Sequence, residues 1–169
     1  DTRTTGKLLK HFGISTPTFS VHQHNEHKKL EYLMELLQGG LNVALVSDAG
    51  MPGISDPGFL AVRAAHQHDI RVEVIPGADA ATTALLASGL PCDTYCFEGF
   101  LPLKKGRQKR LKELAEEERS LIIYESPKRL LKLLNEIKNY FGDHRLAAVA
   151  RELTKKFEEV QRGTIIELI

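Results

Sequence analysis

Apolar and polar positions along this chain follow two different periods. Residues 26–38 carry apolar side chains three and four positions apart, among them Leu30, Leu33 and Leu37, which predicts a helix with one apolar face. Residues 41–47 form a short apolar run that ends at glycine and proline, which is typical of a buried strand. The two periods together predict a protein that alternates strands with helices.

The same pattern extends over the rest of the chain. Strands are expected at residues 41–47, 70–75, 94–98, 121–124 and 146–150, and helices at residues 5–12, 26–38, 57–68, 78–88, 109–118 and 128–140. This alternation predicts parallel strands with right-handed crossovers, and hence a doubly wound α/β sheet. A boundary at Pro91–Cys92 is expected to divide an N-terminal α/β domain, residues 1–91, from a smaller C-terminal α/β domain, residues 92–169.

Two loops rich in small residues follow predicted strands. In residues 47–58, the segment Ser55-Asp-Pro-Gly58 predicts that a helix begins there with free backbone N–H groups. The second loop, Pro76–Gly77, leads into a helix of small residues at 78–88. Open α/β sheets bind ligands at the carboxyl ends of their strands, and small side chains at a helix start let a bulky ligand approach the backbone. Tight packing of helix on sheet is the alternative interpretation.

Seven motifs in one order carry a resemblance to a known family. They are Asp1-Thr-Arg3, His22-Gln-His-Asn-Glu26, Ser47 to Gly58, Ile75 to Pro91, Phe97-Glu-Gly-Phe-Leu-Pro102, Tyr124-Glu-Ser-Pro127 and Ala150 to Glu159. Together they span the chain and resemble the tetrapyrrole methylase superfamily. The resemblance is strongest to members that use S-adenosylmethionine to methylate the ribose 2′-hydroxyl of a cytidine of 16S ribosomal RNA, in the small-subunit decoding centre.

The resemblance implies a methyl-donor site in a cleft between two α/β domains. Asp48 is the expected side-chain contact, because a carboxylate at the end of a strand is suited to accept ribose hydroxyls or the donor's amino group. The alternative is an aspartate that stabilises its own turn. Most other contacts would be made by backbone atoms. The donor contacts carried over from the family are Asp48, Ala49, Gly50, Ile54, Ala80, Ala81, Thr82, Tyr124 and Ala150.

Charged residues of the same motifs are candidates for the acceptor side. Arg3, Arg151 and Lys155 are the expected phosphate or transition-state cations, and Glu125 or Glu152 is the expected proton acceptor. For each residue alone, a solvated network of ion pairs is the alternative. The remaining acceptor-side candidates are Asp1 and Arg129.

A dense basic run lies at residues 104–112, with six basic residues in nine. After the turn at residues 100–102, such a run fits an edge that grips phosphates. The alternative is the solvent face of a helix, balanced in part by the glutamates of residues 113–118. The sequence shows no cluster of aromatic residues that would indicate a base-stacking platform, so RNA held largely through phosphates is expected.

Composition narrows the class of protein. A formal net charge of +1 argues against a general nucleic-acid coat protein. Without an apolar run of membrane-spanning length or a signal-peptide layout, a cytoplasmic protein is expected. Cys92 and Cys96 are expected to be buried thiols of a reducing compartment. No metal site is expected at His22, His24 and His27, because this segment is expected to be a polar loop that enters a helix at Asn25, and the resemblance turns the loop toward the substrate.

The resemblance also implies partners and alternatives. The expected partners are 16S rRNA within the small ribosomal subunit and a second copy of the chain in a homodimer. Family members have a first strand and a Pro-Thr-Pro-Ile-Gly-Asn loop before the first motif and a further strand after residues 164–169, so a fragment that binds the donor poorly is expected. Two other functions stay open: methylation of a corrin or porphyrin precursor, which the histidine-rich loop and basic run disfavour, and donor binding without catalysis.

Overall fold

The chain folds into two compact units, unit 1 over Asp1–Ala78 and unit 2 over Asp79–Ile169. The computed structural model describes residues 2–22 and 25–169. The candidates Asp1 and His24 therefore lie outside the described residues. The expected domain boundary at Pro91–Cys92 stays a prediction, although α4 (Ala80–Ser88) contacts strands of unit 2.

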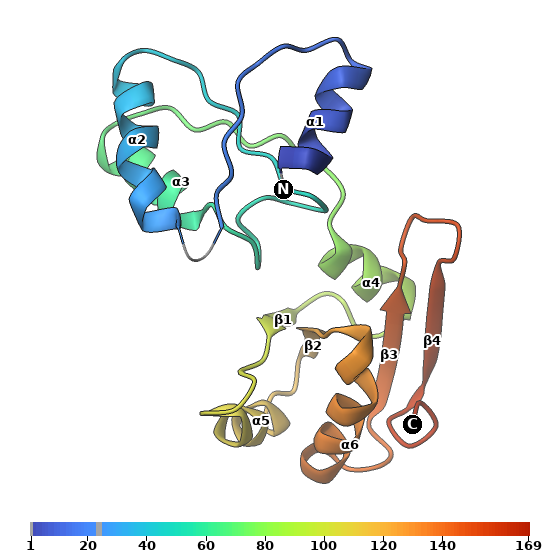
Figure 1. Cartoon of the computed structure of the whole chain (residues 1–169). Helices are drawn as coiled ribbons and strands as arrows, with labels where there is room; N and C mark the ends of the chain where they lie inside the picture. The colour runs from blue at the N-terminus through green and yellow to red at the C-terminus, as the bar shows by residue number, and fades with distance from the viewer. Residues whose placement is uncertain (1, 23–24) are drawn as a thin grey trace. The chain divides into compact units, whose positions relative to one another are not determined.

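Unit 1 contains α1 (Thr2–His11), α2 (Glu26–Gln38) and α3 (Phe59–Gln67) (Figure 1). Helix α2 has the bounds that its apolar period predicts. It packs against α3, and the contact buries Met34 of α2 and Ala64 and Ala65 of α3. Small alanines on α3 let the two helices approach closely, so this pair forms the packed part of unit 1.

The strands predicted at residues 41–47 and 70–75 are wrong. Neither segment has strand pairing in the structure, and both are largely exposed, with Ile75 78 % accessible. An apolar run indicates a preference for burial, but a strand also needs a neighbour that pairs with its N–H and C=O groups. The described part of unit 1 provides no such neighbour, so neither segment is paired as a strand.

Unit 2 contains the paired strands (Figure 1). Its elements in chain order are α4, β1 (Tyr95–Phe100), α5 (Arg107–Ala115), β2 (Ser120–Tyr124), the 3-10 turn η1 (Pro127–Arg129), α6 (Leu130–Phe141), β3 (Leu146–Arg151) and β4 (Glu159–Thr164). Strands β1 and β2 are parallel with α5 as their crossover, as the alternation predicts. Strands β3 and β4 form an antiparallel hairpin. The sequence does not predict β4, because Glu-Val-Gln-Arg-Gly-Thr has little β propensity.

The register of β1 on β2 shifts between Phe97 and Gly99, where β1 carries an extra residue. Gly99 has a φ of 58°, which glycine adopts without the penalty of a side chain. Such a bulge turns the following side chains to the opposite face from the one that simple alternation predicts. Phe97 and Phe100 therefore lie on one face of the strand, and both contact Tyr124 of β2.

Two apolar clusters hold unit 2 together. The larger one lies between α5 and α6, where Leu111 and Ile165 are only 1 % accessible. The smaller one joins α4 to the β1–β2 sheet through Ala81, Leu85 and Ile122. Burying a Leu or Ile side chain stabilises a fold by about 1.5–3 kcal/mol, so the larger cluster contributes most to the stability of the unit.

The prediction that both cysteines are buried is wrong for Cys92 and only partly correct for Cys96. Cys92 is exposed, because it lies in the turn that precedes β1, and the expectation of a buried thiol is wrong there. Cys96 is half-buried on β1 and donates to Glu98 Oε1 at 3.4 Å. Burial and the neighbouring Glu98 carboxylate raise the pKa of the Cys96 thiol. Cys92 and Cys96 are free thiols and form no disulfide with each other.

Candidate functional site

The glycine-rich loop at residues 47–58 is braced by its own side chains. Ser47 Oγ donates to Asp56 Oδ2 at 2.6 Å, which ties the two ends of the loop together. Gly58 has a φ of 137°, and a Cβ there would lie 2.5 Å from Leu45 Cδ2. Only glycine fits that position. The loop thus has a fixed backbone course set by residues far apart within it.

Helix α3 begins later than the sequence predicts. Its N-cap is Gly58, and no side chain caps it. Ser55 and Asp56, the expected capping residues, lie outside the helix, because the Asp56 carboxylate is engaged by Ser47. The Gly58 N–H donates to Glu26 Oε1 of α2 at 3.0 Å. The expected helix start at residue 57 is therefore wrong by two residues.

Four predicted donor contacts lie on this loop of unit 1. A Cβ added to Gly50 would lie 3.8 Å from the Ala78 carbonyl oxygen, so the loop passes close to the end of unit 1. The four residues are all exposed: Asp48, Ala49, Gly50 and Ile54. They are accessible to a ligand, and their role in donor binding stays a prediction.

The start of α4 is capped by Asp79. Its carboxylate accepts the N–H groups of Ala81 and Thr82 at 3.3 and 3.0 Å, and the Thr82 hydroxyl at 2.7 Å. Burial tends to raise the pKa of Asp79, but these hydrogen bonds outweigh it, and the pKa is lowered. The cap satisfies N–H groups that a ligand would otherwise use. A ligand at this helix start would meet small side chains, including that of Ala80, rather than an open row of N–H donors.

An aromatic cluster lies beside this helix start. The ring of Tyr124 forms T-shaped contacts with Phe97 and Phe100, with centroids 5.2 and 5.5 Å apart. Tyr124 also packs on the cluster that contains Ala81 and Leu85 of α4. Burial and the negative charge of Asp79 raise the pKa of the Tyr124 hydroxyl, against the opposing effect of the Ala81 N–H.

The structure therefore brings four of the predicted donor contacts to one corner of unit 2. This corner lies at the carboxyl ends of the parallel strands β1 and β2. The residues that meet there are Ala80, Ala81, Thr82 and Tyr124. The sequence does not reveal this aromatic cluster, because the three rings come from two strands and a bulge aligns two of them.

Several acceptor-side candidates lie in the β3–β4 hairpin. Arg151 pairs with Glu159, and Lys155 Nζ lies 3.2 Å from Glu152 Oε1. Ala150, a predicted donor contact, is half-buried in β3 opposite Val160. The ion pairs match the alternative interpretation of a solvated network, and catalytic roles for these residues stay predictions.

The hairpin turn is strained. Glu152 and Thr154 have φ values of 50° and 63°, which side-chain-bearing residues rarely adopt. The Thr154 N–H donates to Glu158 Oε2 at 2.6 Å and the Lys155 N–H to the Glu152 carbonyl at 3.0 Å, which hold the turn. Such conformations cost about 1–3 kcal/mol each and cluster at functional sites.

Glu125 lies in a buried cluster of ion pairs. Its side chain is 6 % accessible and accepts the Ser126 N–H at 2.8 Å and Arg129 Nη2 at 2.7 Å. Arg107 Nη2 lies 3.6 Å away. Burial alone would raise the pKa of Glu125, but these partners outweigh it and lower the pKa. The lowered pKa makes Glu125 a weaker base than an unperturbed glutamate.

Arg107 is the centre of this cluster, and the sequence did not distinguish it within the basic run. Its guanidinium bonds Glu136 through Nε at 2.8 Å and the Pro102 carbonyl through Nη1 at 3.0 Å. The side chain is 9 % accessible, so it is unable to grip a phosphate. The density of basic residues in the run does not indicate which of them is buried, so the sequence alone could not separate Arg107 from its exposed neighbours.

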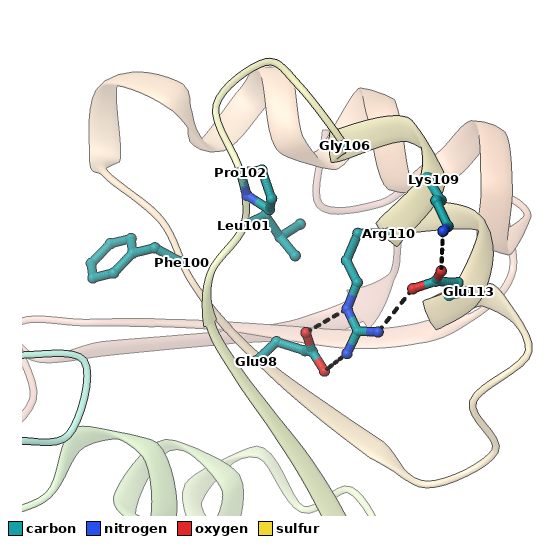
Figure 2. Close-up of a pocket in the computed structure, with 8 residues that line it drawn as sticks. All are labelled: Glu98, Phe100, Leu101, Pro102, Gly106, Lys109, Arg110 and Glu113. Carbon is teal, nitrogen blue, oxygen red and sulfur yellow. Dashed lines mark hydrogen bonds and ion pairs between the residues drawn. The ribbon is translucent and has the colours of Figure 1, made fainter. Parts of the chain in front are cut away.

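The rest of the basic run is divided between ion pairs and solvent. Figure 2 shows Arg110 between Glu98 and Glu113. The Phe100 ring points away from these three side chains. Lys109 Nζ lies 3.9 Å from Glu113 and stays exposed. Lys104, Lys105 and Lys112 are also exposed. The phosphate-binding interpretation therefore applies to the exposed lysines of the run.

Arg3 lies on α1 of unit 1 and is exposed.

Two open pockets flank α5. One, of about 410 Å³, lies between the end of β1 and α5 (Figure 2), and the other has a volume of about 420 Å³. They share Gly106 and Lys109. None of the predicted donor contacts lines either pocket. The pockets therefore belong to the basic loop rather than to the corner at α4.

Within residues 2–22 and 25–169, no group of three or more His, Cys, Asp or Glu side chains could hold a metal ion. In the same residues, no helix has the length and apolar character needed to cross a membrane. Asn25 Oδ1 accepts the His22 N–H at 2.8 Å, which organises the loop before α2.

Comparisons with known proteins match this arrangement to one family. The family model described as Tetrapyrrole (Corrin/Porphyrin) Methylases matches residues 2–169. A crystal structure of the methyltransferase CobJ aligns with a TM-score of 0.62 and 22 % sequence identity, over 90 % of this chain and 67 % of that one. At this identity the likeness shows the fold, which is the predicted α/β class.

Curated relatives are much more similar in sequence. Proteins named Ribosomal RNA small subunit methyltransferase I are 52 % identical in Synechocystis and 51 % identical in Escherichia coli O157:H7, over 98 % and 100 % of this chain. The relative from Streptococcus pyogenes is 49 % identical over 100 %. The chain spans about 60 % of the length of these relatives.

Proposed function

Because the chain belongs to the tetrapyrrole (corrin/porphyrin) methylase family, we propose that it acts in an S-adenosylmethionine-dependent rRNA methyltransferase. The acceptor is the ribose 2′-hydroxyl of a cytidine of 16S rRNA in the small-subunit decoding centre. The observation that carries this proposal is the identity of 49 to 52 % with relatives named Ribosomal RNA small subunit methyltransferase I. The CobJ likeness, at 22 %, gives no comparable support for a corrin or porphyrin precursor.

The corner at α4 fits part of the donor. Ala81 has a short side chain in the cluster on which Tyr124 packs, and the neighbouring Ala80 is exposed, so a flat apolar group could reach the backbone there. Asp79 already accepts two N–H groups of the helix start, so this corner suits a neutral ring better than an anion. The bound donor would supply an electrophilic methyl group on sulfur.

The protein's own contribution is orientation. Holding the acceptor hydroxyl in line with the methyl group supplies about 7–11 kcal/mol in well-aligned reactions. The partners of Glu125 lower its pKa, which makes it a weaker proton acceptor than an unperturbed glutamate. Glu152 is exposed beside Lys155, and we propose that it accepts the proton of the acceptor hydroxyl. The cations Arg151 and Lys155 would face the developing charge or a phosphate.

RNA contact is assigned to the exposed lysines of the 104–112 run. Lys104, Lys105, Lys109 and Lys112 are accessible, whereas Arg107 is buried and Arg110 is paired. The small ribosomal subunit is the partner, the protein acts as a homodimer, and the compartment is the cytoplasm. Because the chain is nearly neutral, RNA binding would depend on a few local contacts. We therefore expect tighter binding to the assembled small subunit, which presents a fixed shape, than to short RNA.

Transfer of a tritiated methyl group tests the proposal. Tritiated S-adenosylmethionine is incubated with the protein at its full length and either small subunits, large subunits or a porphyrin precursor as acceptor. Label confined to the small subunit supports the proposal. Label on the porphyrin precursor, or label in neither ribosomal subunit, contradicts it.

A further inference from the structure

We propose that residues 100–106 form a nucleotide-binding element in which Phe100 stacks on a base of the RNA and Lys104 and Lys105 bind its phosphates. This inference rests on the proposed function, which it deepens by naming how the acceptor RNA is held. It concerns residues that neither the predicted donor contacts nor the predicted catalytic residues include.

Phe100 presents an aromatic face to solvent although it lies in a strand. The side chain is 56 % accessible, and its ring forms a T-shaped contact with Tyr124 at 5.5 Å between centroids. The bulge at Gly99 places it on the same face as Phe97 and Tyr124. A T-shaped contact covers at most one face of a ring, so the other face of Phe100 is available for stacking. Figure 2 shows the ring directed away from the Glu98–Arg110 ion pair.

The lysines follow on a loop that is pinned at both ends. Leu101 is 5 % accessible at one end, and the buried Arg107 at the other bonds the Pro102 carbonyl at 3.0 Å. The Arg107 N–H donates to the Lys104 carbonyl at 3.2 Å. Residues 102–106 between these anchors are all exposed. A loop ordered in this way loses little entropy when it binds a ligand.

Charge decides between the two nucleobases that could stack on Phe100. The donor carries an adenine but a positive sulfonium and no phosphate, so two lysines beside its ring would repel it. A nucleotide of single-stranded RNA offers a base together with phosphates. Lys104 is four residues from Phe100, at most about 14 Å along the chain, which a few nucleotides span. An aromatic plane followed by a basic loop is the usual combination for single-stranded nucleic acid.

The test compares variants of the protein at its full length. Phe100→Leu keeps apolar bulk but removes the aromatic plane, and Phe100→Trp keeps the plane. Tyr95→Leu is the matched control, because Tyr95 is 41 % accessible at the opposite end of the same strand. Affinities are measured for a short cytidine-rich single-stranded RNA, for purified small subunits and for S-adenosylmethionine. Thermal melting checks that each variant is folded.

Loss of one stacked base should weaken binding of both RNA probes by roughly 5- to 150-fold in Phe100→Leu, and by less than about threefold in Phe100→Trp. Donor affinity and the Tyr95→Leu control should not change. Equal RNA affinity in Phe100→Leu and wild type overturns the inference, as does an equal loss in the control. Weaker donor binding with unchanged RNA binding assigns the ring to the donor's adenine and also overturns it. Methyl transfer by the wild type is scored separately, so RNA binding that depends on Phe100 without methyl transfer would refute the proposed function alone.

Discussion

Arg107→Met should destabilise unit 2 far more than loss of any other basic residue of the 104–112 run. The guanidinium contacts Glu136 Oε2 at 2.7 and 2.8 Å, Glu125 Oε2 at 3.6 Å and the Pro102 carbonyl at 3.0 Å, and it is 9 % accessible. Removing one partner of a buried ion pair costs about 3–5 kcal/mol, because it leaves an uncompensated charge. Glu125 keeps Arg129, and Glu136 is partly solvated, so the lower end of about 3 kcal/mol is expected.

The assay is urea denaturation followed by circular dichroism, with Lys109→Met as the matched control. Lys109 is 84 % accessible and 3.9 Å from Glu113, so its loss should cost no more than about 0.5–1 kcal/mol. The double variant Arg107→Met/Glu136→Gln should recover part of the loss, because it also removes the orphaned carboxylate. A loss below about 1 kcal/mol in Arg107→Met, or no difference from Lys109→Met, would refute the assignment of Arg107 as a buried ion-pair centre.

The cluster also predicts the pH dependence of stability. The folded pKa of Glu125 is lowered, so its stabilising effect is complete above the unfolded pKa, about 4.3, and is lost as the pH falls through the folded value. Arg107→Met should reduce this loss, because it removes one of the cations that lower the pKa. Denaturation midpoints measured from pH 7 down to pH 3 therefore converge between variant and wild type. Parallel curves would contradict the linkage.

Three further predictions concern the binding residues and the helix cap. Replacing Lys104 and Lys105 by alanine should reduce the slope of log affinity for small-subunit RNA against log salt by about 1.4–1.8, with donor affinity unchanged; an unchanged slope would remove these lysines from the RNA contact. Asp48→Ala should weaken donor binding about tenfold or more, since a hydrogen bond to a charged group contributes about 1.5–3 kcal/mol, and calorimetry showing equal affinity would leave Asp48 as a turn residue. Asp79→Ala should lower the free energy of unfolding by about 0.5–2 kcal/mol, because it removes the α4 cap. Since the pKa of Asp79 is lowered, this loss should be present at pH 7 and should shrink as the pH falls below about 4, and a loss independent of pH would argue against the cap.

The elements that the sequence predicts well are those whose partners are close in the chain. Helix α2 has a strong 3.6-residue period, and its observed bounds, Glu26–Gln38, are the predicted ones. Strands β1 and β2 are joined by one helix, so their parallel pairing follows from local rules. Residues 41–47 carry the same kind of apolar signal as β2, but pairing depends on a neighbour that a local pattern does not contain.

The arrangement of the candidate site could be predicted from the sequence only in part, for a similar reason. Small residues at the start of α4 indicated a place where a ligand could approach, the family resemblance named Ala80, Ala81 and Thr82 there, and the structure places Tyr124 beside this helix. The position of Phe100 depends on the bulge at Gly99, which reverses the alternation of side chains and leaves no signature in a period-2 pattern. Burial of Arg107 depends on Glu136, which is distant in the sequence, so composition alone made it look like its exposed neighbours.

The position of the transferred methyl group distinguishes methylation of a cytidine ribose from every other methylation of the subunit. Small subunits labelled with tritiated S-adenosylmethionine are digested to nucleosides, and the labelled nucleoside is identified by chromatography against standards. We expect a single labelled product, 2′-O-methylcytidine, from 16S rRNA. A label on the base of any nucleoside, or on the ribose of a nucleoside other than cytidine, would contradict it.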